Sequence, residues 1–112
     1  AAEHSSGQDP GVQQTISYCI AQLSEGPERS VEAARELFEF AHTSHDCSEV
    51  NKEQMNREQA VPALCKILEA ESDEARYEAC STLSELAFRN TRNCMDIVHT
   101  PGALQSLGKI LR

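Results

Sequence analysis

The fold class of this chain is decided by residues 61–87, which read VPALCKILEAESDEARYEACSTLSELA. Two sets of apolar or small residues recur in this stretch at i, i+3, i+4 and i+7, the spacing of a helix that buries one face. The first set is Val61, Leu64, Cys65, Ile67 and Leu68, and the second is Ala79, Cys80, Leu83, Leu86 and Ala87. The stretch therefore predicts two amphipathic helices joined by a short polar turn at residues 70–73.

This pair of helices occurs more than once. Leu68 lies 45 positions after Leu23 of ISYCIAQL (16–23), and Leu111 lies 43 positions after Leu68, in LQSLGKIL (104–111). The second helix has an earlier copy at an offset of 46, in which Val31, Ala33, Ala34, Leu37, Phe40 and Ala41 match Tyr77, Ala79, Cys80, Leu83, Leu86 and Ala87. Self-similarity at such a period is the signature of a helical solenoid, in which each unit buries its apolar face against the next.

Capping signals divide the rest of the chain into helices. Asp9 before Pro10 predicts the start of a first helix that ends near Ser24. Four other helices are predicted at residues 27 to about 42, 61 to about 71, 73 to about 89 after a Ser72 cap, and 100–112. Two short helices are also predicted: one is capped by Ser48 or Asn51 and ends near 57, and the other runs from a Thr91 cap to about 98. The order is long, long, short, long, long, short, long, with no strand, and residues 1–8 are predicted to be a disordered polar tail.

A short helix followed by two longer ones resembles the armadillo repeat. The resemblance is carried by Thr100-Pro101-Gly102-Ala103-Leu104, with Leu107, Ile110 and Leu111, which is similar to the start of the family's second helix, and by EACSTLSELA (78–87), which is similar to its third helix. HEAT repeats share the apolar pattern but have two helices, and the short helices at 49–57 and 92–98 favour armadillo. The resemblance implies a right-handed, all-α solenoid at 9–112, with a partial repeat at 9–47, a full repeat at 48–90 and a truncated repeat at 91–112.

The chain departs from the family pattern at three positions. Gln59 stands where the second unit should have a glycine, which predicts a wider helix junction there. In the family, asparagines on the third helices line a concave groove and hold the backbone of an extended peptide, but Glu39 and Glu85 occupy those positions here. The resemblance therefore implies an acidic groove, suited to a basic or hydrogen-bond-donating partner.

The candidate binding residues lie on these third helices. Arg35, Glu39 and His42 are spaced to share one helix face, and so are their counterparts Ser81, Glu85 and Phe88, with Arg89 nearby. One interpretation is a surface that binds a protein or peptide, in which an exposed Phe88 would be an anchor. The alternative is an ordinary solvated face, on which Arg35 and Glu39 form a weak i,i+4 pair.

The sequence contains candidate metal ligands but no catalytic motif. His42, His45 and Cys47 have metal-ligand chemistry, but a structural zinc site needs four ligands, and His4 completes the set only if the chain folds back. The alternative is a polar helix C-terminus with a histidine favoured by the helix dipole. No phosphate-binding glycine loop, Gly-x-Ser-x-Gly or paired-histidine motif is present. The sequence predicts no enzyme, no cofactor and no metal.

The net charge and the cysteine content indicate which kinds of binding partner and which cellular compartment to expect. The net charge of −8, from 18 acidic and 10 basic residues, argues against nucleic acid and against an anionic membrane surface. No apolar run is long enough to span a bilayer. Five cysteines, three of them on apolar stripes, favour free thiols in a reducing intracellular compartment, the cytoplasm or an organelle interior, although one bridge stays possible.

The last predicted helix presents Leu104, Leu107, Ile110 and Leu111. Either it covers the preceding unit with that face, or another protein supplies the next layer. The sequence thus predicts a non-enzymatic scaffold that binds protein or peptide through its third helices. The alternatives are a structural subunit whose uncovered helix ends dock on neighbours in a larger complex, and a small metal- or redox-responsive protein that uses the 42–47 loop.

Overall fold

A computed structural model describes residues 8–110 of the chain, and these residues form seven α-helices and no strand. The all-α prediction is therefore confirmed for this part of the chain. The helices are α1 (Pro10–Gln22), α2 (Pro27–Ala41), α3 (Ser48–Arg57), α4 (Ala60–Ile67), α5 (Asp73–Ala87), α6 (Thr91–His99) and α7 (Ala103–Ile110). Residues 1–7 of the predicted tail, with His4, and Leu111 and Arg112 lie outside the described residues.

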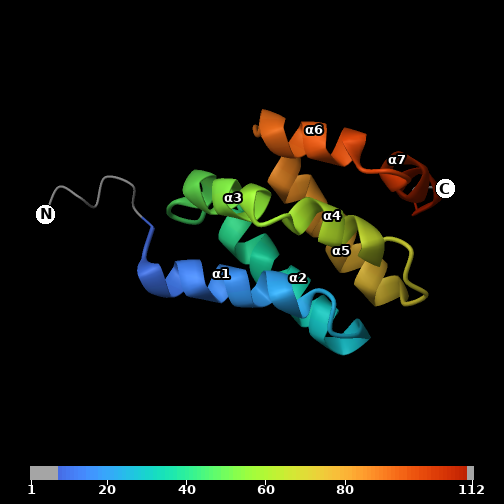
Figure 1. The fold of residues 1–112 in the computed structure, drawn as a ribbon, viewed down its shortest axis with the longest axis horizontal. Helices are drawn as coiled ribbons and strands as arrows, with labels where there is room; N and C mark the ends of the chain where they lie inside the picture. Colours follow the sequence, from blue (N-terminus) through green and yellow to red (C-terminus); the bar gives the residue numbers. More distant parts are fainter. Residues whose placement is uncertain (1–7, 111–112) are drawn as a thin grey trace, which may run out of the picture.

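The helices pack in chain order. Helices α1 and α2 form one end, α3, α4 and α5 lie in the middle, and α6 and α7 form the other end (Figure 1). The two predicted third helices, α2 and α5, pack against each other, and the molecule measures 49 × 28 × 21 Å. The interface between α2 and α5 is therefore a large part of the core.

The core consists of aliphatic and small residues. Ile16, Leu37, Leu64 and Leu86 have no solvent-exposed surface, and each such side chain contributes about 1.5–3 kcal/mol of burial free energy. Small side chains on the third helices, such as the fully buried Ala34 and Ala79, let these helices approach closely. The chain thus builds its core without tryptophan.

The helix caps confirm two predictions and correct two others. Asp9 accepts a hydrogen bond from the backbone N–H of Gly11, and Ser72 accepts one from that of Ala75. For α3, neither Ser48 nor Asn51 is the cap, because Cys47 holds that position in a left-handed conformation with φ of 66° and Asn51 lies inside the helix. For α6, the cap is Asn90 instead of Thr91, and its side chain accepts from Asn93 N–H.

The predicted order of long and short helices is wrong for α4. It has eight residues, whereas α3, predicted to be short, has ten. Helix α4 ends at Ile67 because Leu68, Glu69 and Ala70 donate to carbonyls three positions earlier, which tightens the chain into a turn. Residues 101–102 form a turn before α7, so the last helix starts later than predicted.

Buried polar side chains on α3 were not predicted from the sequence. Asn51, Lys52 and Gln54 are fully buried, although all three are residue types that usually remain at the surface. Asn51 donates to the carbonyl of Phe40, Gln54 to that of Gln13, and Gln8 donates to both amide side chains. Each buried amide thus satisfies a carbonyl on another helix, and α3 holds α1 and α2 together.

Candidate functional site

The third-helix face is defined by Arg35, Glu39 and His42, on and directly after α2, and by Ser81, Glu85, Phe88 and Arg89, on and directly after α5. The first three residues match Ser81, Glu85 and Phe88 at the 46-residue offset, and α2 packs directly against α5. The two rows therefore belong to adjacent, equivalent helices. Arg35, Glu39, Phe88 and Arg89 are exposed, and His42, Ser81 and Glu85 are half-buried.

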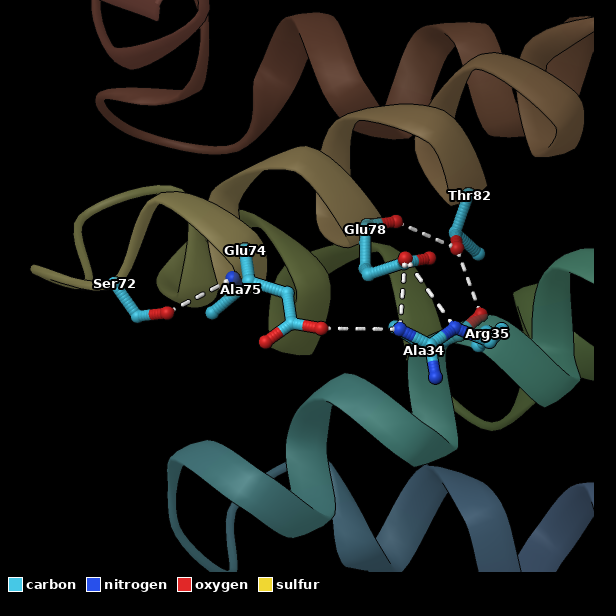
Figure 2. Close-up of polar contacts among 7 residues, drawn as sticks. All are labelled: Ala34, Arg35, Ser72, Glu74, Ala75, Glu78 and Thr82. Atoms are coloured by element: carbon cyan, nitrogen blue, oxygen red, sulfur yellow. Dashed lines mark hydrogen bonds and ion pairs between the residues drawn. The ribbon is translucent and has the colours of Figure 1, made fainter.

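Arg35 joins the two helices through carboxylates of α5 (Figure 2). Its Nη2 lies 3.2 Å from Glu78 Oε2 and 3.3 Å from Glu74 Oε2, and its Nε donates to Glu78 at 3.3 Å. The hydrogen bond and charge of Glu78, followed by those of Glu74, raise the pKa of Arg35. The sequence suggested an ion pair with Glu39 on the same helix, but the guanidinium instead binds across the junction.

A buried hydroxyl reinforces the same junction. Thr82 Oγ1 lies 2.8 Å from the carbonyl oxygen of Ala34 on α2 and 2.8 Å from that of Glu78 on its own helix (Figure 2). Thr82 has no exposed surface, so its proton has no water to bond. The register of α2 against α5 is therefore fixed by a buried hydrogen bond between neutral groups and by an exposed ion pair.

The predicted aromatic anchor, Phe88, lies at the C-terminal end of α5 with 47% of its surface exposed. Two cations flank its ring, Lys52 Nζ at 5.4 Å and Arg89 Cζ at 5.3 Å from the centroid. Lys52 Nζ also donates a hydrogen bond to the Phe88 carbonyl oxygen at 2.8 Å. This carbonyl lies at the C-terminal end of α5, where the helix dipole favours a cation. The buried lysine thus fixes the backbone below an exposed ring.

The two third helices are strongly acidic. They carry eight carboxylates against three arginines, and two of the arginines, Arg35 and Arg76, already bind carboxylates of α5. The side-chain carboxylates of Glu39 and Glu85 have neither a hydrogen bond nor an ion pair within the described part of the chain. The third-helix face therefore offers unneutralised carboxylates.

The 42–47 loop does not assemble metal ligands. His42 Nδ1 lies 2.8 Å from Ser44 Oγ, and the His42 ring lies beside the Phe38 ring, tilted by 47° with 5.6 Å between centroids. His45 Nδ1 contacts the Asp46 carbonyl, and its ring lies edge-on to Phe40. Within residues 8–110, no three His, Cys, Asp or Glu side chains are placed to hold a metal ion.

The cysteines on the apolar stripes are protected thiols. Burial first, and then the hydrogen bond that Cys19 Sγ donates to Glu36 at 3.2 Å, raise the pKa of Cys19 to about 12. Burial also raises the pKa of Cys65 and of Cys80. Among the described residues no cysteines are joined by a disulfide. These thiols therefore stay protonated and weakly nucleophilic at neutral pH.

A second surface lies between α5 in the middle of the molecule and α7 at its end. This α5/α7 groove has a volume of about 1490 Å³, and its lining includes Tyr77, Cys80, Ser84 and Ala87 of α5 and Leu107 and Ile110 of α7. Leu104, at the start of α7, has 55% of its surface exposed. The sequence left open whether the apolar face of this last helix is covered; the structure leaves Leu104 exposed and Leu107 and Ile110 half-buried.

Comparison with known proteins identifies one segment. Residues 48–88 match the family described as Armadillo/beta-catenin-like repeat, a segment that begins with α3 and ends at Phe88, immediately after α5. No curated protein and no solved structure gave a significant match. In the described part of the chain, no helix has the length and apolar character needed to cross a membrane. The resemblance seen in the sequence is confirmed for this segment: residues 48–88 match the armadillo repeat family.

Proposed function

We propose that this chain is a non-enzymatic scaffold that binds a basic peptide or protein segment through its third-helix face. Armadillo repeats are generally protein-interaction modules, and the repeat at 48–88 supplies the general class. The observation that carries the specific proposal is the excess of carboxylates on α2 and α5, with Glu39 and Glu85 unneutralised at equivalent positions.

The arrangement favours an extended basic segment over a compact ligand. Equivalent carboxylates recur on adjacent helices, so cationic side chains along one segment can meet them in succession. Phe88 adds an aromatic surface at one end of this row. Charge complementarity of this kind speeds association and fixes orientation more than it adds affinity.

The proposal is tested by charge neutralisation. A fluorescently labelled Lys/Arg-rich peptide is titrated against the chain and against the double variant Glu39→Gln/Glu85→Gln, with anisotropy as the readout. Loss of two attractive charges near the peptide should weaken binding about tenfold at low salt, and the difference should shrink as salt screens it.

The matched control is Glu49→Gln/Glu53→Gln, which removes two exposed carboxylates from α3 and leaves the third-helix face intact. It changes the net charge equally, so it should bind nearly as well as the unmodified chain. Equal weakening by both double variants would show that only the overall charge matters, and the proposed face would be wrong.

The α5/α7 groove favours a second candidate function, a structural subunit that docks on a neighbour through one uncovered end. In that role, the groove and not the acidic face would make the principal contact. The two candidates use different residues and are therefore separable by mutation.

A further inference from the structure

The C-terminal end of α5 carries two cations that no carboxylate neutralises. Lys52 Nζ and Arg89 Cζ lie 5.4 Å and 5.3 Å from the centroid of the Phe88 ring, and Lys52 donates to a neutral group, the Phe88 carbonyl. Neither side chain forms an ion pair with a carboxylate of residues 8–110. The chain has a net charge of −8, yet this end of its third-helix face is locally positive.

The two cations differ in burial. Lys52 is fully buried, and a buried charge without an opposite charge nearby is unfavourable. Arg89 is exposed, so its guanidinium is the group that a partner can reach. Because both cations lie over the same ring, an anion bound at Arg89 would be attracted by Lys52 as well. The end of α5 therefore favours an anionic group.

Glu85 and Arg89 do not neutralise each other, although they are four positions apart. A glutamate and a basic residue at this spacing on a helix commonly form an ion pair. Here α5 ends at Ala87, and Arg89 leaves the helical path with φ of 53°, so that its guanidinium lies over the Phe88 ring. A free carboxylate and a free guanidinium therefore remain side by side on the third-helix face.

The equivalent end of α2 lacks such a cation. At the 46-residue offset, His42 corresponds to Phe88 and Thr43 corresponds to Arg89. A neutral threonine thus stands where the end of α5 has a guanidinium. The positive group belongs to one end of the third-helix face, so it can distinguish one placement of a bound segment from another.

We propose that the segment bound by the third-helix face carries charges of both signs. Its basic residues meet Glu39 and Glu85, and an adjoining aspartate or glutamate places its carboxylate on the Arg89 guanidinium beside Phe88. This inference rests on the proposed binding of a basic segment and specifies which residue type adjoins the basic ones. Guanidinium and carboxylate form paired hydrogen bonds, and complementary charges in a fixed order set the register of a partner.

Peptide extension tests the inference. A labelled Lys/Arg-rich peptide is extended by two glutamates at its C-terminus or at its N-terminus, and the reference peptides carry two glutamines instead. Because the net charge of the chain is −8, overall charge alone predicts weaker binding of the glutamate peptides. The inference predicts the opposite sign: one glutamate peptide should bind about fivefold tighter than its reference at low salt, measured by anisotropy.

Variants assign the gain to one residue. Arg89→Gln should abolish the gain without weakening the binding of the glutamine peptides. Arg89→Lys keeps the charge but loses the planar guanidinium, so it should keep part of the gain. The matched control is Arg57→Gln, which removes an exposed arginine from α3 and changes the net charge equally, and the gain should remain.

The two proposals fail separately. The carboxylate site at Arg89 is wrong if neither glutamate peptide binds more tightly than its reference, or if the gain survives Arg89→Gln. It is also wrong if Arg57→Gln removes the gain as completely as Arg89→Gln does. In these three cases, binding of the glutamine peptides still supports the basic-segment proposal. A chain that binds none of the peptides contradicts both proposals.

Discussion

Gln59 holds a backbone conformation that normally suits glycine. Its φ is 68°, and the equivalent residue 43 positions later, Gly102, has φ of 81°. Both positions lead into a predicted second helix, and Gln59 also closes α3 by donating its N–H to the Asn56 carbonyl. The sequence therefore identified the departure from glycine at this position correctly. The backbone accommodates it by holding Gln59, a residue with a side chain, in the left-handed region.

Replacing Gln59 with glycine should stabilise the chain. A left-handed residue other than glycine is disfavoured by about 1–2 kcal/mol, and the greater freedom of glycine in the unfolded state offsets about half of this. The expected gain in free energy of unfolding for Gln59→Gly is about 0.5–1 kcal/mol, measured by urea denaturation. Gln59→Ala keeps the backbone strain and should give no comparable gain. Equal gains from the two substitutions would show that the effect comes from removal of the glutamine side chain.

At the scale of elements, the α2–α5 junction combines an exposed ion pair with a buried hydrogen bond. The Arg35 side chain is 51% exposed, so its attraction to Glu74 and Glu78 is weakened by water and by salt. Thr82 has no such competition. Sequence periodicity identified both helices, but Arg35 could not be paired with α5 in advance, because the partner depends on how far the helices slide along each other.

Substitution should therefore separate the two contacts. Thr82→Val keeps the shape but removes the bond to the Ala34 carbonyl, with an expected loss of about 1 kcal/mol in the free energy of unfolding at any salt concentration. Arg35→Gln should produce a smaller loss that disappears as salt rises. Thr82→Ser retains the hydroxyl and is the control. A larger effect for Arg35→Gln at high salt would reverse this ranking.

At the scale of the whole molecule, the sequence predicted the all-α class, the armadillo resemblance and the positions of seven helices, because apolar spacing follows directly from burial. It did not predict the helix lengths or the buried polar residues of α3. Lys52, for example, has the composition of a surface residue, and only its position below the end of α5 explains why it is buried. The candidate binding residues of α2 and α5 were identified from repeat register, and their binding role stays a prediction.

The sparse packing of α7 has a kinetic consequence. Helices α4 and α7 occupy equivalent positions, but α4 packs against α3, α5, α6 and α7, whereas α7 packs mainly against α4 and α6. Local opening of α7 therefore exposes less apolar surface and requires less free energy. In deuterated water, the amides of α7 should exchange faster than those of α4; equal rates would show that α7 opens only when the whole domain unfolds.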